Sequence, residues 1–274
     1  MNVTRSIARR NVRRSLAVLA GFGLVAGAVT TAASTAQATP PRPAHAKKAA
    51  YDGYYDDAKG KTGKELKKAL HTIISRDAKK LSYDQVLDAL KETDKDPKND
   101  KNVIELYTGK SVSADSREWN REHVWAKSHG DFGTKEGPGT DVHHLRPADM
   151  KVNSTRGNKD FDNGGDEVEG APGNRTDDDS FEPRDAVKGD VARMILYMAV
   201  RYEGDDSFPD LEPNDKVDNG SAPNMGRLSV LKKWNEQDPP DDFEKNRNQV
   251  IFDKFQHNRN PFVDHPEWVK SIWS

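Results

Sequence analysis

The feature that most constrains this chain is the segment between Arg117 and Phe161, which concentrates three groups of chemically capable side chains. A carboxylate stands beside a histidine in residues 121–126, Arg-Glu-His-Val-Trp-Ala. Two histidines follow an aspartate in residues 141–147, Asp-Val-His-His-Leu-Arg-Pro, and an asparagine precedes an arginine in residues 152–158, Val-Asn-Ser-Thr-Arg-Gly-Asn. Such side chains can hold a hard divalent cation and activate a water molecule beside a phosphodiester.

The same segment predicts two short strands and a helix. Val124-Trp125 is typical of a strand, and residues 142–145 predict a second strand beyond a glycine-rich loop at 132–139. Pro147 follows that strand, and residues 148–155 predict the start of a helix that carries its asparagine inward. The three groups of side chains therefore belong to neighbouring elements.

Helical patterns dominate the rest of the chain. Thr62-x-x-Glu65 and Ser82-x-x-Gln85 are capping boxes, and each is followed by apolar residues on one helical face. We therefore predict an α+β fold, a helix-rich single domain with a small β element in the middle. The other expected elements are helices at 190–203, 228–234 and 243–256, a strand at 103–108, and turns or loops at 94–102 and 162–179.

The first 38 residues are typical of a secretory signal peptide. Five arginines precede an apolar run from Leu16 to Ala33, and residues 36–38, Ala-Gln-Ala, fit a small-x-small cleavage site. A membrane anchor is the alternative, but the run is only marginally long enough to span a bilayer. Residues 39–53 are expected to be flexible, and 54–274 to form the folded domain. We expect a secreted protein without stable membrane association after cleavage.

Composition restricts the chemistry. The chain has no cysteine, so thiolate metal sites and cysteine nucleophiles are excluded. Without the five arginines of the signal peptide, 38 basic residues stand against 45 acidic ones. Proteins that bind nucleic acid are usually basic, so a polyanionic substrate would have to meet a local basic groove or a bound metal.

Glu122, His123 and Asn153 supply the groups that phosphodiester hydrolysis requires. A neutral imidazole, with an ordinary pKa of about 6.5, can take a proton from water. A cation held by a carboxylate and an amide oxygen keeps several positions open for water and phosphate. Neighbouring residues of a regular strand point to opposite faces, so Glu122 and His123 can serve one site only at a strand end or a bulge.

The order Glu-His-Val, Asp-x-His-x-Leu-x-Pro and Val-Asn-x-x-Arg resembles the bacterial endonuclease I family of secreted and periplasmic nucleases, of the ββα-metal (His-Me finger) class. The resemblance extends from about Tyr55 to Trp268. It implies a catalytic domain over 54–274 with a central ββα-metal motif, in which Glu122 and Asn153 bind the metal and His123 is the general base. It also implies Mg²⁺ as cofactor, with Mn²⁺ or Ca²⁺ as alternatives, and cleavage of DNA and RNA with little sequence preference, leaving 5′-phosphate ends.

Two further residues of these motifs are expected to support the site without binding metal, namely Asp141 and His143. The sequence also departs from the family pattern. Gly139 stands where relatives have an acidic residue, and His144 replaces the asparagine of a His-Asn pair. The role of His144 is left open.

Three arginines are predicted to bind substrate: Arg121, Arg146 and Arg156. Some relatives place an arginine in an insertion that this chain lacks, and these three or Lys135 could replace it. For Arg156, an ion pair on a helix surface is an equally good interpretation.

Two other functions are compatible with the sequence. One is a secreted binding protein without catalysis that engages a partner through calcium or acidic loops, which the acidic composition and Gly139 would suit. The other is a metal-dependent phosphoesterase for small substrates, which would need a closed pocket rather than a groove for a polymer. We expect the protein to be a monomer.

Overall fold

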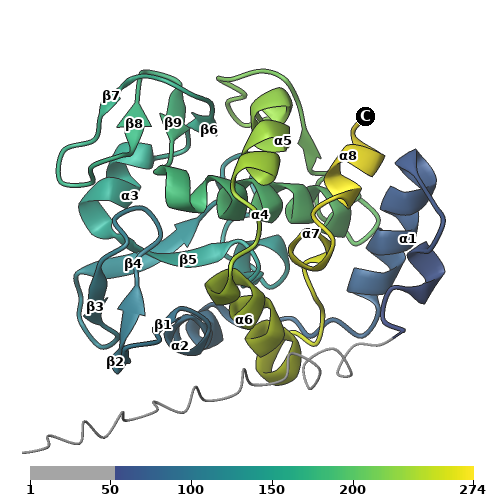
Figure 1. Ribbon diagram of the computed structural model, residues 1–274, viewed down its shortest axis with the longest axis horizontal. Helices are drawn as coiled ribbons and strands as arrows, with labels where there is room; N and C mark the ends of the chain where they lie inside the picture. Colours follow the sequence, from purple (N-terminus) through teal and green to yellow (C-terminus); the bar gives the residue numbers. More distant parts are fainter. Residues whose placement is uncertain (1–52) are drawn as a thin grey trace, which may run out of the picture. The chain divides into compact units, whose positions relative to one another are not determined.

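The computed structural model describes residues 53–274, so the predicted signal peptide and nearly all of the predicted flexible segment lie outside the described residues. Helices and several small sheets form this part of the chain (Figure 1), which confirms the predicted α+β class. None of the helices between residues 53 and 274 combines the length and the apolar character that a membrane span requires.

The centre of the domain is helix α4 (Lys188–Arg201), whose residues from Gly189 onward are all buried. Helices α1 (Gly63–Ser75), α5 (Leu228–Gln237) and α7 (Pro261–Asp264) pack against it (Figure 1). Because α4 is covered on all sides, its apolar residues surround the helix instead of forming one stripe. They form the middle of the larger hydrophobic cluster.

The two capping boxes have different outcomes. At the start of α2 (Tyr83–Thr93), the Ser82 hydroxyl accepts a bond from the backbone N–H of Gln85, whose side chain accepts one from the Ser82 N–H. Helix α1 begins where the other box predicted, but the side chain of Thr62 forms no capping bond. Both helices bury the predicted apolar face.

Strands β4 (Trp119–His123) and β5 (Leu145–Asp149) form an antiparallel pair, and helix α3 (Met150–Arg156) follows directly. The Asp149 carboxylate caps α3 by accepting bonds from two backbone N–H groups of its first turn. The predicted order of strand, strand and helix is therefore present, and it brings the three motif segments together (Figure 1).

The predicted bounds of both strands were wrong. The strand expected at Val124-Trp125 ends at His123, and the strand expected over 142–145 only begins at its last residue. Val124 and Trp125 are apolar because they are fully buried in the core, not because they alternate in a strand. Pro147 lies inside β5, which is possible because a strand with a single strand partner tolerates a residue without an N–H.

The β4–β5–α3 unit lies between two hydrophobic clusters. Val124, Trp125 and Val152 join the larger cluster around α4. Trp119 and Leu145 join a smaller one with apolar residues of α2 and of the segment after α6. Apolar contacts on both sides thus hold the unit that carries the motif residues.

The remaining elements are short. The turn predicted for 94–102 contains a β-hairpin, the strand predicted for 103–108 ends at Ile104, and the loop predicted for 162–179 contains a pair of two-residue strands. The small sheets are β1 (Lys95–Asp96), β2 (Asn99–Ile104) and β3 (Ser111–Ser113); β6 (Asp160–Phe161), β9 (Ser180–Glu182), β8 (Arg175–Thr176) and β7 (Asp166–Glu167), in that spatial order; and the parallel pair β10 (Glu212–Pro213) and β11 (Asn224–Met225). The other helical segments are η3 (Asp56–Ala58), η4 (Pro138–Thr140), η5 (Asp185–Val187), α6 (Asp242–Val250), the π-helical η6 (Ile251–Phe255) and α8 (Trp268–Ile272).

Candidate active site

A cleft of about 370 Å³ lies along β4 and α3. The β4 residues from Asn120 to His123 line it together with Asn153 of α3. Among residues 53–274, β4 pairs only with β5, so its other edge has no strand partner there and side chains from both of its faces can reach one cleft. Glu122 and His123 therefore serve the same space although they are neighbours. The other lining residues are Tyr83, Ala126, Lys127, Ser128, Ser154, Gly157 and Asn158.

His123 is held at the last position of β4 by a backbone carbonyl. Its Nε2 lies 3.1 Å from the oxygen of Gly139. A carbonyl oxygen can only accept, so Nε2 carries the proton and Nδ1 keeps its lone pair. Burial, with a contribution from the nearby His144, lowers the pKa of His123 to about 3. The side chain is therefore neutral at neutral pH and can accept a proton at Nδ1.

Gly139 owes its identity to packing. A Cβ at this position would lie 2.5 Å from the carbonyl oxygen of Gly133 and 2.8 Å from the Cα of Thr134. Both distances are shorter than van der Waals contact, so the loop can approach His123 this closely only with a glycine here. The residue at which the sequence departs from the family pattern thus supplies the acceptor that orients His123.

Glu122 is buried, and side chains donate hydrogen bonds to only one of its carboxylate oxygens. Oε1 accepts hydrogen bonds from the Tyr107 hydroxyl at 2.6 Å and from Nη1 of Arg156 at 3.1 Å. Among residues 53–274, no side chain donates a hydrogen bond to Oε2, and the backbone N–H of His123 also acts on the carboxylate to lower its pKa. Burial raises the pKa of the Glu122 carboxyl, and Arg156 and the Tyr107 hydroxyl oppose that rise.

Asn153 presents an amide oxygen to the same cleft. Its Nδ2 donates a hydrogen bond of 2.6 Å to Oδ1 of Asn120, which leaves the Asn153 Oδ1 as an acceptor without a partner among the described residues. The described residues contain no group of three or more His, Cys, Asp or Glu side chains arranged to hold a metal. The donor set is therefore one carboxylate oxygen and one amide oxygen. It fits a hard cation such as Mg²⁺, which retains several waters.

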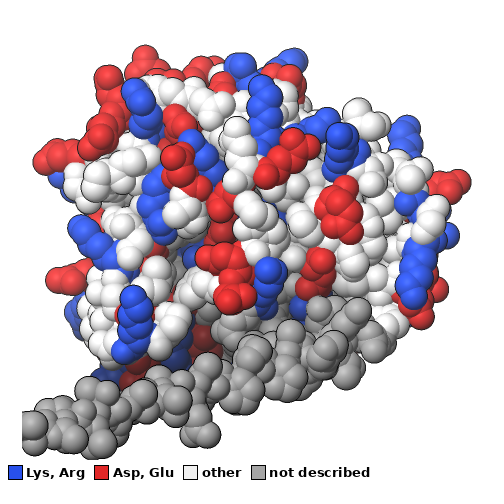
Figure 2. All heavy atoms as spheres, in the orientation of Figure 1, with Lys and Arg blue, Asp and Glu red and all other residues white. Residues whose placement is uncertain are grey.

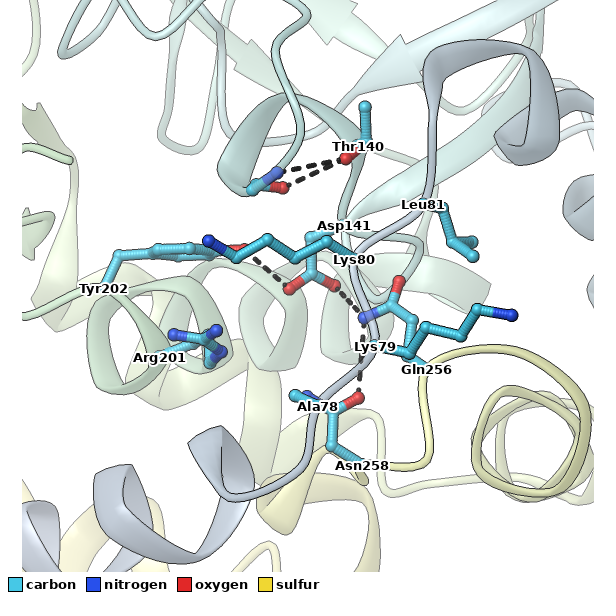
Figure 3. A pocket seen from close by; sticks show the side chains of 11 residues that line it. Ala78, Lys79, Lys80, Leu81, Thr140, Asp141, Arg201, Tyr202, Gln256 and Asn258 are labelled. Carbon is cyan, nitrogen blue, oxygen red and sulfur yellow. Dashed lines mark hydrogen bonds between the residues drawn. The ribbon is translucent and has the colours of Figure 1, made fainter. Parts of the chain in front are cut away.

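Asp141 is buried and does not line the cleft; it lies at a separate small pocket, where its carboxylate faces Tyr202 and Gln256 (Figure 3). Oδ2 accepts bonds from the hydroxyls of Tyr197 and Tyr202, and Oδ1 accepts bonds from the Gln256 amide and the His143 backbone N–H. Burial alone would raise the pKa of Asp141, but His143 and Gln256 hold it below its ordinary value. This carboxylate joins α4, η4 and the segment after η6.

The two adjacent histidines do not line the cleft. Nε2 of His143 lies 3.1 Å from Oδ1 of Asn258, and its ring packs on Tyr197. His144 connects two segments, because its Nδ1 accepts a bond from the Trp125 N–H and its Nε2 lies 2.7 Å from the Pro138 oxygen. His144 thereby positions η4, whose Gly139 carbonyl contacts His123. The supporting role predicted for Asp141 and His143 stays a prediction, and this geometry suits it.

The burial of two arginines contradicts the expectation that they bind substrate. Arg146 is 1% exposed, and its guanidinium bonds Asp94 and Asp190. Arg156 is fully buried and donates to Glu122 and to the backbone oxygens of two adjoining residues. A phosphate could reach either side chain only by replacing these internal acceptors. The alternative of an ion pair on a helix surface was also wrong for Arg156, whose ion pair is internal.

Arg121 is the predicted arginine that does line the cleft. Its guanidinium lies 3.5 Å from the centre of the Tyr83 ring, and Nη1 donates a bond of 2.7 Å to the Tyr83 carbonyl. The Tyr83 ring in turn runs nearly parallel to that of His123 at 6.1 Å. Lys127 also lines the cleft, whereas Lys135 is exposed elsewhere.

Charge on the surface is mixed. Figure 2 shows basic and acidic side chains interspersed on the face in view, without a continuous field of one sign. This agrees with the near balance of charges in the sequence. At the cleft itself, the cationic side chains among the lining residues are Arg121 and Lys127, which can supply local positive charge for a polyanion.

Sequence reasoning missed several residues that shape the site. Nothing in the sequence shows that Tyr107, at the end of an apolar run, contacts Glu122. Nothing in it shows that Asn120 contacts Asn153 either. Lys127 and Tyr83 were also not assigned. The available signals were the two departures from the family pattern, Gly139 and His144, both of which contribute to the orientation of His123.

Comparison with known proteins adds independent evidence. Residues 62–267 match the family model described as Endonuclease I. A protein of Bacillus subtilis (strain 168) named "Extracellular ribonuclease" is 65% identical over 227 residues, which covers 81% of this chain and 78% of that protein. A protein of Bacillus amyloliquefaciens with the same name is 66% identical over 225 residues, covering 80% of this chain and 78% of that protein.

Proposed function

This chain belongs to the endonuclease I family, and we propose that it is a secreted, metal-dependent nuclease that hydrolyses RNA and DNA with little sequence preference. The observation that carries the proposal is the content of one cleft. A neutral histidine, a carboxylate oxygen and an amide oxygen without side-chain partners among residues 53–274, and two cationic side chains all line it.

His123 would act as the general base. Its Nδ1 accepts a proton from a water molecule, whose oxygen attacks the phosphorus while the bond from phosphorus to the 3′ oxygen breaks. The low pKa of His123 belongs to the free protein. A phosphate anion beside the ring favours the protonated form and would raise that pKa as the proton arrives.

Glu122 and Asn153 would hold the metal through Oε2 and Oδ1. A bound Mg²⁺ supplies positive charge for the phosphate and for the departing 3′ oxygen. Arg121 would contact a non-bridging phosphate oxygen, because stacking on Tyr83 fixes its guanidinium at the cleft. Lys127, which is exposed at the cleft, would be a second cation for the neighbouring phosphate. The products would carry 5′-phosphates.

RNA is the substrate that the names of the two Bacillus relatives support, and their description as extracellular supports export of this chain. We include DNA as a substrate because none of the side chains that line the cleft would exclude a sugar without a 2′-hydroxyl. We also propose that the enzyme acts as a monomer.

The test is cleavage of a single-stranded RNA and of supercoiled plasmid DNA by the purified protein, with Mg²⁺ and with EDTA. We expect cleavage that needs Mg²⁺ and is lost in His123→Ala. The control is His265→Ala, which alters a histidine that does not line the cleft and should keep full activity. Folded His123→Ala with undiminished cleavage would refute the assignment of the base.

A further inference from the structure

The two oxygens of Glu122 have very different surroundings. Oε1 accepts two hydrogen bonds from side chains, the Tyr107 hydroxyl and Arg156, whereas Oε2 accepts none from a side chain of residues 53–274. Tyr107 and Arg156 are both fully buried. Because these donors are shielded from water, Oε1 remains hydrogen-bonded to the protein interior.

Both donors are held by contacts that do not involve Glu122. Arg156 donates to the oxygens of His123 at 2.8 Å and Val124 at 2.7 Å, and its guanidinium lies 4.7 Å from the centre of the Phe161 ring. The Tyr107 ring packs on Phe181 at 4.9 Å between centres. The direction of the Glu122 carboxylate is therefore set by its surroundings before any ligand binds.

We propose that Tyr107 and Arg156 are positioning residues that make Glu122 a one-oxygen ligand, and that they thereby set the preference of the site for Mg²⁺ over Ca²⁺. This inference rests on the proposed function, in which Glu122 holds the cation. Ca²⁺ takes six to eight oxygen ligands and often uses both oxygens of a carboxylate. Mg²⁺ takes six at short distances, retains waters and is served by single carboxylate oxygens.

The decisive variant is Tyr107→Phe, which removes one hydroxyl and keeps the ring that packs on Phe181. Without that hydroxyl the carboxylate can turn, and Oε1 becomes available to a larger cation. We expect the Kd for Mg²⁺, measured by calorimetry without substrate, to rise about tenfold, as is usual when a partner of a metal ligand is lost. The Kd for Ca²⁺ should rise less, so the preference for Mg²⁺ shrinks. An unchanged ratio of the two Kd values in the folded variant overturns the inference.

Tyr202→Phe is the matched control. Tyr202 is also buried, and its hydroxyl donates at 3.0 Å to a buried carboxylate, that of Asp141, which does not line the cleft (Figure 3). It should change neither Kd. Equal changes in both tyrosine variants would mean that any lost internal bond loosens the site, and would overturn the specific role of Tyr107.

Glu122→Gln separates this inference from the proposed function. If Glu122→Gln binds Mg²⁺ as the wild type does, Glu122 is not a ligand and both proposals fall. If Glu122→Gln loses Mg²⁺ but Tyr107→Phe keeps the wild-type ratio, only the present inference fails.

Infrared spectroscopy of the wild-type protein decides the question should Tyr107→Phe not fold. The separation of the two carboxylate stretching bands is wide for a carboxylate that binds through one oxygen and narrow for one that binds through two. The Glu122 bands are those that disappear in Glu122→Gln. A wide separation with Mg²⁺ supports the inference, and a narrow one overturns it.

Discussion

Glu122 and Asp141 are both buried carboxylates in motif segments, and both accept a hydrogen bond from a buried tyrosine. They differ in how their hydrogen bonds are divided between the two carboxylate oxygens. Asp141 accepts two bonds on each oxygen, from Tyr197, Tyr202, Gln256 and the backbone of His143. Glu122 accepts both of its side-chain bonds on Oε1, and no side chain of residues 53–274 donates to Oε2.

This difference separates a structural carboxylate from a candidate ligand. Carboxylate chemistry, burial and place in a motif segment do not distinguish the two, because Glu122 and Asp141 share all three. The number of acceptor positions that the protein leaves unfilled does distinguish them. Among the arginines the separation is by burial: Arg121 lines the cleft, whereas Arg146 and Arg156 are buried in the interior.

The sharpest test of the comparison exchanges each carboxylate for its amide. Glu122→Gln should lower kcat/KM about a thousandfold, because the site loses several kcal/mol of charge stabilisation. Asp141→Asn should instead lower the free energy of unfolding by about 3 kcal/mol, since an amide cannot accept all four bonds. Cleavage assays and urea unfolding measure the two quantities. Loss of Mg²⁺ binding by folded Asp141→Asn, equal to that of Glu122→Gln, would abolish the distinction.

The arginines extend the comparison. Arg146→Met should lower the free energy of unfolding by about 3–5 kcal/mol, because it leaves Asp94 and Asp190 buried with a partner missing. Its KM should stay unchanged at temperatures where it is folded. Arg121→Gln should lower kcat/KM about tenfold, the effect of losing one charged hydrogen bond, and should barely alter unfolding. If Arg146→Met instead lowered kcat/KM and left unfolding unchanged, the substrate-binding role predicted for Arg146 would be supported.

Acid should weaken the interior through His143 and His144. Burial lowers the pKa of each to about 4, against an ordinary value of 6.5. Between these values the unfolded chain binds more protons than the folded one, so stability falls as the pH falls from 6.5 to about 4. The loss should reach about 3 kcal/mol per histidine. Urea unfolding at several pH values measures it, and His144→Gln should flatten the profile. A constant unfolding free energy across that window would contradict the prediction.

The smallest expected effect concerns the helix that carries Tyr83 into the cleft. Ser82→Ala should lower the free energy of unfolding by about 1 kcal/mol, because the Ser82 hydroxyl caps α2. Thr62→Ala is the control, since Thr62 forms no capping bond in α1, and its effect should be close to zero. Thermal unfolding of both variants compares them. Equal losses of unfolding free energy in the two variants would mean that the Ser82 cap stabilises the protein no more than Thr62 does.

Much of the framework could be predicted from the sequence. The amphipathic faces of α1 and α2, the buried helix α4 and the strand–strand–helix order follow from local periodicity, which depends on residues close together in the chain. The strand bounds could not be predicted in the same way. Val124, Trp125 and Val142 are apolar because two clusters bury them, and burial in a core is not a local property.

The same limit applies to the site. Glu122, His123 and Asn153 could be named because their chemistry and spacing are visible in the chain. The burial of Arg146 could not be predicted, because its partners Asp94 and Asp190 lie 52 and 44 residues away in the sequence. Tyr107 was missed because nothing in an apolar run shows which carboxylate its hydroxyl will reach.

The contact between His123 and Gly139 has a consequence for how this enzyme can change by mutation. Its acceptor is a main-chain oxygen, which every amino acid possesses, so no single substitution can delete it. Substitution of Gly139 can only displace the loop, because any Cβ there collides with Gly133 and Thr134. Selection on the orientation of the proposed general base therefore acts on the space around a glycine, and a lineage can lose that orientation through steric changes in residues 133–139 while the side chains of Glu122, His123 and Asn153 are unchanged.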